Sequence, residues 1–229
     1  MKLQDGRLEG RTDRLAAREV GEAMAVSAMK EGVSRFKRGL VLRAAAKLFS
    51  ERGYAATTID AITDELSASK RAIYDHFAGK AEILVEICEQ AVRFSVDLAE
   101  RVARGPGDPV AKLRLLARDF TGIVIENQDY IAISSREMKF LPEDSHRRIL
   151  RMQERFDRIL GSILAEGVAR GSFDLADPAI TGLAISGMII WVHRWYRAGG
   201  RLSPQEIAEA MAETALRMAA ASGAKRVAR

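Results

Sequence analysis

The sequence predicts an all-α protein, with a small N-terminal domain of three short helices and a larger C-terminal helical domain, about nine helices in all. Residues that favour helices (Ala, Leu, Met, Glu, Lys and Arg) dominate the 229 residues. Only five prolines and few β-branched runs occur, which argues against an all-β fold. Apolar residues also recur at helical spacing between breaks marked by glycine and proline.

Composition limits the class of protein further. Hydrophobic residues make up 48% of the chain, enough for a packed core. The single cysteine, Cys88, has no partner within the chain for a disulfide, and no apolar leader segment is visible. The longest stretch without charged side chains, residues 178–193, is shorter than the ~20 apolar residues of a membrane span. We therefore expect a soluble, cytoplasmic protein.

Positive charge is spread along the chain. The net charge of +5 divides into 0 for residues 1–34, +2 for residues 35–87 and +3 for residues 88–229. Because no segment is a polycationic tail, binding to nucleic acid would require a fold that gathers the cations on one surface.

The chain begins with a weakly patterned segment and a clear helix. Residues 1–34 lack a strong apolar stripe, and we expect a flexible or weakly helical arm there. A helix begins at Arg38 and ends at Gly53. Its inward face consists of Leu40, Val41, Ala44, Ala45, Leu48 and Phe49.

Two short helices follow, separated by a tight turn at Ser67–Ala68. The first, capped by Thr57 with Asp60 at its third position, ends near Leu66, and the second covers residues 69–77. This is a helix-turn-helix pattern, in which the last helix can enter the ~12 Å major groove of DNA. Side chains suited to phosphates and base edges lie on or just after that helix: Ser69, Lys70, Arg71, Tyr74, His76 and Lys80. Asp75 shares its outward face. A solvated helix face in an ordinary bundle is the alternative.

Residues 38–89 resemble the N-terminal DNA-binding domain of the tetracycline-repressor (TetR/AcrR) family of bacterial transcription regulators. The matching positions are Ala44, Ala45, Leu48, Phe49, Gly53, Tyr54, Thr57, Thr58, Ile59, Ile62, Ser69, Ile73, Tyr74, His76, Phe77, Lys80 and Leu84. The resemblance implies a DNA-binding domain over residues 35–80 and a homodimer on a palindromic operator, with recognition helices ~34–36 Å apart. It implies bases facing Lys70 and Arg71, and further DNA contacts by Thr57, Thr58, Ser69, Tyr74, His76 and Lys80.

Two positions depart from the family's pattern. Ser67 stands where the family usually has glycine in the turn, at a cost of about 1 kcal/mol if its φ is positive. Arg71 stands where a small residue is common. Its guanidinium could read guanine, worth ~1–3 kcal/mol of discrimination, or add a phosphate contact, and both interpretations stay open.

Residues 81–229 form the predicted ligand-binding and dimerisation domain. A long helix runs from Lys80 to Gly105, the next begins at Asp108–Pro109, and a further break falls at Pro142. Another apolar stripe follows at Ile149, Met152, Phe156, Ile159 and Ile163.

The helix predicted over residues 178–198 is apolar nearly all round, which indicates burial on every side. Gly182 and Ser186, four residues apart, permit close approach of another helix. With the last helix, which begins at Ser203–Pro204, it is expected to form half of a four-helix dimer interface. A core helix within a monomer is the alternative.

An effector pocket is expected between the middle helices. Methionine and aromatic side chains suit an adaptable apolar cavity, although most of them are expected to be ordinary core. The candidate ligand-binding residues are Phe120, Tyr130, Ile133, Met138, Phe140, Met152, Phe156, Met188, Trp191, Arg194 and Trp195.

Residues 191–207 are similar to family members that respond to acyl-CoA thioesters. That similarity implies that Arg136, Arg194 or Arg197 pairs with the ligand's phosphates, although each could equally form a salt bridge within the protein. An effector would favour a conformer with wrongly spaced recognition helices, and a coupling of 1–3 kcal/mol is enough for release from DNA. Repression is the family's usual mode.

An enzyme is not indicated. His76, His146, His193 and Cys88 lie on separate predicted helices. The sequence holds no nucleophile-elbow, phosphate-loop or metal-ligand motif, so neither a cofactor nor a metal is expected. A helical structural or adaptor protein is the remaining alternative. It predicts absent or salt-insensitive DNA binding, whereas a DNA-binding regulator loses affinity steeply as salt rises.

Overall fold

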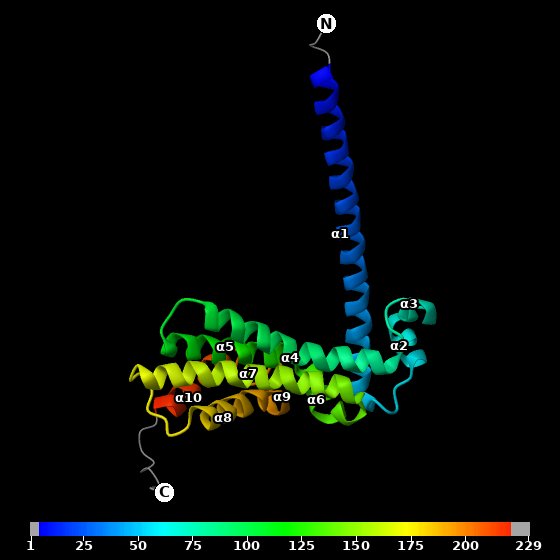
Figure 1. Ribbon diagram of the computed structural model, residues 1–229. Helices are drawn as coiled ribbons and strands as arrows, with labels where there is room; N and C mark the ends of the chain where they lie inside the picture. Colours follow the sequence, from blue (N-terminus) through cyan, green and yellow to red (C-terminus); the bar gives the residue numbers. More distant parts are fainter. Residues whose placement is uncertain (1–4, 221–229) are drawn as a thin grey trace.

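The structure, a computed structural model, describes residues 5–220, with side chains from residue 27 onward. Within that range the chain forms ten α-helices, one short 3-10 helix and no strand (Figure 1). The predicted all-α class is confirmed. Helices α1 to α3 meet at one end of an elongated body that contains the remaining helices.

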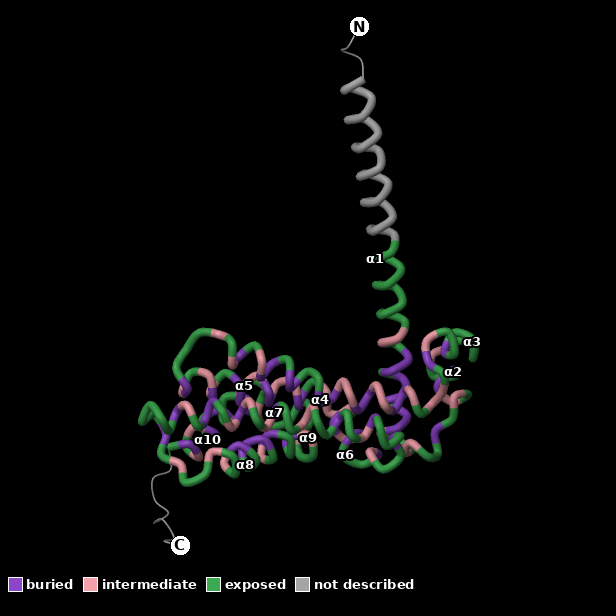
Figure 2. Tube along the Cα trace, viewed as in Figure 1, coloured by how far each residue is buried: buried purple, intermediate pink, exposed green. Residues whose placement is uncertain are grey.

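The first helix, α1 (Asp5–Arg52), is much longer than predicted. We expected a flexible or weakly helical arm over residues 1–34 and a separate helix start at Arg38, but residues 5–34 form one continuous helix with the residues that follow; residues 1–4 lie outside the described part. Residues 27–37 are exposed on every side, and the helix projects from the body (Figure 2). An apolar stripe marks where a helix packs, so its weakness does not exclude a helix in a segment rich in Ala, Glu and Arg.

The connection from α1 to α2 follows local backbone chemistry. Gly53 follows α1 with a φ of 82°, as expected for a glycine after a helix. The cap of α2 (Ile59–Leu66) is Thr58, whose side-chain oxygen accepts from the Ala61 N–H; the predicted cap, Thr57, was wrong by one residue. Ser67 then turns the chain in the left-handed region, with φ 49° and ψ 40°.

The third helix, α3 (Lys70–Tyr74), is shorter than the predicted range of 69–77. Ser69 caps its first turn through the side-chain oxygen. The chain then continues as a turn, in which the backbone N–H of Phe77 donates to the oxygen of Ile73 at 2.9 Å. Ile73 and Phe77 are both buried, so they anchor the short helix in the core.

The body is organised around α4, which begins beside α1 and packs against α5, α6 and α7. Helix α10 lies along α5, and α8 lies along α7. Buried apolar residues from both ends of the molecule belong to one core. The elements of the body are α4 (Lys80–Arg104), α5 (Pro109–Glu126), α6 (Gln128–Glu137), η1 (Met138–Phe140), α7 (Glu143–Ala169), α8 (Pro178–Ile190), α9 (Val192–Trp195) and α10 (Pro204–Ala220).

Two predicted helix starts are confirmed in atomic detail. Asp108 accepts from the backbone N–H of Ala111 at 2.8 Å, with proline in the first turn of α5. Ser203 and Glu206 form a reciprocal capping box at the start of α10, and these hydrogen bonds lower the pKa of Glu206.

The helix predicted over residues 178–198 is interrupted. Helix α8 ends at Ile190, and the short α9 follows Trp191. The side-chain amide of Gln128 on α6 donates to the backbone oxygens of His193 and Tyr196. These two carbonyl groups therefore bond to a side chain of another helix instead of to backbone N–H groups of a longer α8.

Gly182 and Ser186 are buried and face the interior of the chain. A methyl group at Gly182 would lie 3.6 Å from the side chains of both Leu160 and Leu164 on α7. Ser186 lines a cavity beneath α8. The predicted close approach of another helix therefore occurs within the chain: these small residues let α8 pack closely against α7.

Candidate nucleic-acid interface and effector cavity

The exposed face of α3 carries two cations and a phenol. Lys70, Arg71 and Tyr74 are all exposed. The Lys70 ammonium lies 2.7 Å from the carboxylate of Asp60 on α2, and this hydrogen bond raises the pKa of Lys70. The guanidinium of Arg71 has no ion pair or hydrogen bond to another residue in the described part of the chain. Arg71 is therefore free to meet a base edge or a phosphate.

Two hydroxyl groups flank this face. Thr58 and Ser69 are exposed, and their oxygens accept backbone N–H groups at the starts of α2 and α3, at 3.1 and 3.2 Å. Since each hydroxyl keeps its own hydrogen, each can cap its helix and still donate to a phosphate.

Thr57 lies behind the surface. It is fully buried, and its hydroxyl donates to the backbone oxygen of Gly53 at 2.9 Å and that of Leu48 at 3.3 Å. The prediction that Thr57 contacts DNA is therefore wrong. Its hydroxyl instead holds the end of α1 against the start of α2.

The Lys80 ammonium is used within the protein. Its Nζ donates to the backbone oxygens of Tyr54 and Thr57, at 2.8 and 2.7 Å, and to that of Ala55 at 3.3 Å. It also lies 4.3 Å from the centre of the Tyr54 ring, and burial lowers the pKa of Lys80. These acceptors occupy all three N–H groups, which contradicts the predicted phosphate contact. Lys80 ties the start of α4 to the loop between α1 and α2.

His76 lies beside the exposed face of α3. It follows the helix and is half-buried in a groove between α1 and α3 that Leu40 and Leu66 also line. Its predicted phosphate contact would come from the edge of the helix-turn-helix rather than from the exposed face of α3.

Arg38 has a structural role that was not predicted from the sequence. Its guanidinium donates to the backbone oxygen of His76 and to the carboxylates of Glu82 and Glu86 on α4. It also lies 4.1 Å from the centre of the Phe77 ring. The signal for this role in the sequence was indirect: Glu82 and Glu86 form an acidic pair one helical turn apart. Arg38 joins α1, the segment after α3 and α4 in one cluster.

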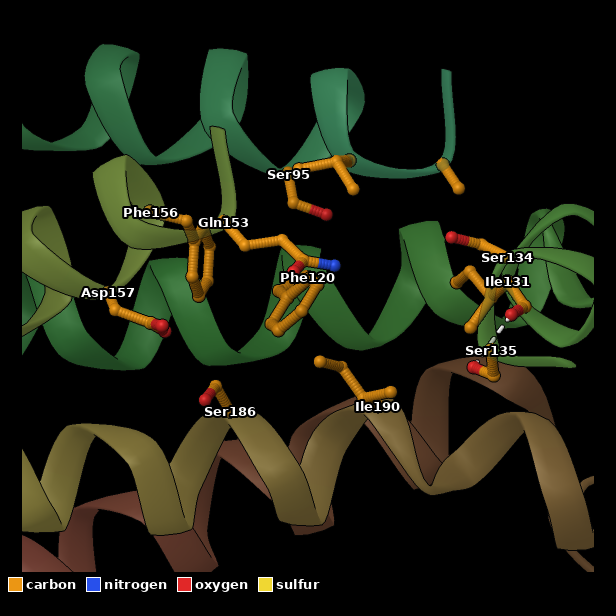
Figure 3. Close-up of a pocket in the computed structure, with 12 residues that line it drawn as sticks. Ser95, Phe120, Ile131, Ser134, Ser135, Gln153, Phe156, Asp157, Ser186 and Ile190 are labelled. Atoms are coloured by element: carbon orange, nitrogen blue, oxygen red, sulfur yellow. Dashed lines mark hydrogen bonds between the residues drawn. The ribbon is translucent and has the colours of Figure 1, made fainter. Parts of the chain in front are cut away.

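A cavity of about 290 Å³ lies between α4, α5, α6, α7 and α8 (Figure 3). Two predicted ligand-binding residues, Phe120 and Phe156, line it, with ring centres 4.7 Å apart and an interplanar angle of 48°. The full lining is Ala91, Val92, Ser95, Phe120, Ile131, Ser134, Ser135, Gln153, Phe156, Asp157, Ser186 and Ile190.

The other predicted ligand-binding residues lie outside this cavity. Four belong to the core or pack against it: Ile133, Met138, Met152 and Met188. Tyr130 lines a separate groove beside α1, and the ring of Phe140 lies 5.3 Å from that of Tyr54. Three are exposed at the end of α8 and on α9: Trp191, Arg194 and Trp195. Aromatic and methionine content therefore located the cavity poorly.

Half of the cavity lining is polar, and none of these polar residues was predicted from the sequence. They are Ser95, Ser134, Ser135, Gln153, Asp157 and Ser186. A signal was available on α7, where Gln153 and Asp157 interrupt the apolar stripe one turn apart. Burial raises the pKa of Asp157, and its carboxylate has no hydrogen bond or ion pair in the described part of the chain.

Cys88 lies on α4 one turn from the cavity lining. It is fully buried, and that burial raises the pKa of its thiol to about 12. A thiol with such a pKa holds its proton at neutral pH and is a poor nucleophile.

Comparison with known proteins decides the family. Residues 41–87 match the family described as bacterial regulatory proteins, tetR family, and residues 106–219 match the tetracyclin repressor-like C-terminal domain. The crystal structure of PfmR, a TetR family transcriptional regulator from Thermus thermophilus, is 33% identical, with a TM-score of 0.72, and the match covers 77% of this chain and 97% of that chain. This chain belongs to the tetR family of bacterial regulatory proteins.

Further relatives are also transcription regulators. The HTH-type transcriptional repressor KstR2 of Mycobacterium tuberculosis is 25% identical over 177 residues, which cover 76% of this chain and 88% of that protein. The fold is shared with AibR, whose crystal structure is a complex with isovaleryl coenzyme A and operator DNA; it is 22% identical, with a TM-score of 0.68, and covers 78% of this chain and 97% of that chain. The predicted family resemblance is confirmed.

In this tetR-family chain, one helix serves both candidate sites. The first turns of α4 carry Lys80, Glu82 and Glu86, which hold the helix-turn-helix, and further along the same helix Ala91 and Ser95 line the cavity. Across residues 27–220, no group of three or more His, Cys, Asp or Glu side chains is arranged to hold a metal ion. No helix in the described part of the chain combines the length and apolarity needed to cross a membrane.

Proposed function

We propose that this tetR-family DNA-binding regulator represses transcription as a homodimer on an operator and is released when a small effector fills the cavity. The observation that carries this proposal is the exposed face of α3 with Lys70, Arg71 and Tyr74, whose arginine has no partner within the described protein. The capped helices α2 and α3 hold this face beside the first residues of α4. Residues further along α4 line the cavity.

The proposed dimer interface is the outer face of α8 together with α10. Ile180, Leu183 and Trp191 are 62%, 51% and 60% exposed in the single chain. Ala184 and Gly187 are exposed between them, and a methyl group on Gly187 would have no neighbour within 4 Å. A contiguous apolar stripe of this kind is typical of a surface that a second subunit covers, and its small residues permit close approach. The dimer would present recognition helices about 34–36 Å apart.

The cavity is the proposed effector site. Its volume of about 290 Å³ is at the lower end of the range for small-molecule sites, roughly 300–1,000 Å³. An effector there would touch α4 and shift the population toward a conformer with a different spacing of the recognition helices. A coupling of about 1–3 kcal/mol is sufficient for release.

The predicted response to an acyl-CoA thioester stays a prediction. The isovaleryl coenzyme A bound to AibR supports it. None of the cavity-lining residues is Lys, Arg or His, however. The phosphates of coenzyme A would therefore have to bind outside the cavity, near Arg136, Arg194 or Arg197.

DNA selection with the full-length protein tests this function. Operators are selected from a random DNA pool, and affinity is measured by fluorescence anisotropy at several salt concentrations. We expect two related half-sites and an affinity that falls steeply as salt rises. Absent or salt-insensitive binding would favour the helical adaptor protein instead.

Arg71→Ala is the variant that tests this function most directly. It should weaken binding to the selected operator by about 1–3 kcal/mol and relax the sequence preference at the base pair that Arg71 meets. Arg158→Ala, on the exposed side of α7, is the control and should leave both quantities unchanged. If the affinity loss is equal for all sequences, Arg71 contacts a phosphate rather than a base.

A further inference from the structure

The effector cavity contains one charged residue, and that residue is acidic. Asp157 is the single ionisable side chain among the twelve residues that line the cavity. Nearby arginines on α7 pair elsewhere, Arg155 with Glu100 and Arg158 with Glu154. The Asp157 carboxylate itself has no ion pair or hydrogen bond within the described chain. A half-buried carboxylate without a partner is unfavourable, and a ligand that supplies the partner removes this cost.

Two phenyl rings share the space with this carboxylate. Phe120 comes from α5 and Phe156 from α7, and their ring centres are 4.7 Å apart. Figure 3 shows both rings and the side chain of Asp157 pointing into the space between α7 and α8. The faces of aromatic rings attract cations, so the rings and the carboxylate favour the same kind of ligand.

The serine side chains add hydrogen-bond acceptors. The hydroxyl of Ser135 donates to the backbone oxygen of Ile131 at 2.9 Å, and that of Ser186 donates to the backbone oxygen of Leu183 at 3.1 Å. Each hydroxyl therefore spends its single hydrogen on its own helix, and its oxygen remains free to accept from a ligand. A ligand that donates hydrogen bonds therefore fits these serine oxygens better than a ligand that accepts them.

We propose that the effector is a small organic cation, an amine with a compact apolar body, whose ammonium group lies against Asp157 and whose body packs on Phe120 and Phe156. This rests on the proposed function, because it assigns the effector to the same cavity. The cavity volume of about 290 Å³ limits the body to a compact one. The ligand's chemistry therefore differs from that of an acyl-CoA thioester, whose charged groups are anionic.

A series of probes with one body and three head groups tests the proposal. Binding of 2-phenylethylammonium, 2-phenylethanol and phenylacetate to the full-length protein is measured by isothermal titration calorimetry, with isovaleryl coenzyme A as a fourth probe. We expect the ammonium to bind about tenfold or more tightly than the alcohol, and phenylacetate to bind most weakly. Overturning results are no binding of the ammonium at millimolar concentration, or tighter binding of phenylacetate or isovaleryl coenzyme A.

Two variants locate the cation. Asp157→Asn keeps the shape of the side chain and should weaken ammonium binding about tenfold, while affinity for the alcohol stays unchanged. Asp97→Asn removes an exposed carboxylate on α4 that does not line the cavity, and it should change neither. Circular dichroism checks that both variants fold. Equal ammonium affinity in the wild type and Asp157→Asn would contradict the proposal.

Operator binding is measured in parallel, so that failure of the cation proposal can be distinguished from failure of the proposed function. Wild-type protein that binds selected DNA without preferring the ammonium overturns this inference and leaves the proposed function intact. Wild-type protein that does not bind DNA overturns the proposed function. Release of DNA by 2-phenylethylammonium from the wild type, but not from Asp157→Asn, supports both.

Discussion

Ser67 places strain in the turn between α2 and α3. It is the one non-glycine residue of the described chain with a positive φ, 49°. Glycine adopts this conformation without the Cβ penalty, so Ser67→Gly should raise the free energy of unfolding by about 1 kcal/mol in urea denaturation. Ala68→Gly is the matched control at a neighbouring position without a positive φ, and it should be neutral or destabilising. Equal effects of the two substitutions would contradict the strain.

Asp157 gives the second prediction for a single residue. Burial raises its pKa in the folded state, so the folded protein holds this proton more tightly than the unfolded chain does. Ionisation at pH 7 therefore lowers stability, and this cost disappears as the pH falls below the unfolded pKa of about 3.9. Asp157→Asn should unfold at a higher temperature than the wild type at pH 7, and the difference should shrink towards pH 4. A difference that grows on acidification would contradict the shift.

Thr57 and Lys80 show what residue identity does not predict. Both occupy positions that match the family, yet the Thr57 hydroxyl and the Lys80 ammonium are bound to backbone oxygens inside the protein. A sequence specifies the donor at each position, but the acceptor depends on how the chain folds around it. Arg71 and Tyr74 were easier to place, because their positions on a short amphipathic helix already required exposure.

Lys80 also links elements, and this link gives a prediction. Lys80→Ala removes hydrogen bonds between α4 and the loop before α2, and should lower the free energy of unfolding by about 1–3 kcal/mol without DNA. The salt dependence of DNA binding should keep its slope, because no phosphate contact is lost. Lys70→Ala is the contrasting variant: its exposed ion pair adds little stability, so the free energy of unfolding should stay nearly unchanged, while operator affinity should fall because the ammonium faces DNA. The reverse pattern would place Lys80 on a phosphate.

Helix boundaries were predictable where the cause was local. Asp108 and Ser203 start helices as expected, because caps and prolines act within one turn. The break after α8 was missed. Beyond it, the backbone oxygens of His193 and Tyr196 bond to the side chain of Gln128, more than sixty residues away in the chain, and no local pattern signals that contact. The length of α1 was missed for a different reason: helix-favouring residues continue past the last packed turn, where an apolar stripe is not needed.

At the scale of the whole molecule, one substitution tests the proposed dimer interface on α8. Leu183→Glu places a carboxylate on the apolar stripe and should weaken dimer formation by about 2–4 kcal/mol, because the charge would be buried without a partner. Sedimentation velocity should then detect monomers at micromolar concentration, with reduced affinity for operators with two half-sites. Leu150→Glu, at an exposed leucine on α7, is the control and should remain dimeric. A dimeric Leu183→Glu protein would place the interface elsewhere.

The cavity was the least predictable feature because it exists only at the scale of the assembled chain. Its lining comes from five helices, and the serines that contribute to it are ordinary helix residues in the sequence. Only the relative rotation of the helices decides which serines face inward. The all-α class and the helix-turn-helix follow from short-range patterns, so they could be predicted.

The shielded thiol of Cys88 makes the protein convenient for spectroscopy. Thiol-directed spin labels react with thiolates, and a buried group with a pKa of about 12 offers almost none at neutral pH. The chain has no other cysteine, so an Ala72→Cys protein would take up one nitroxide at the exposed surface of α3 and need no second substitution to silence the native residue. In the proposed dimer, pulsed dipolar measurements on this labelled protein would give the separation of the two α3 helices directly, with DNA present or absent.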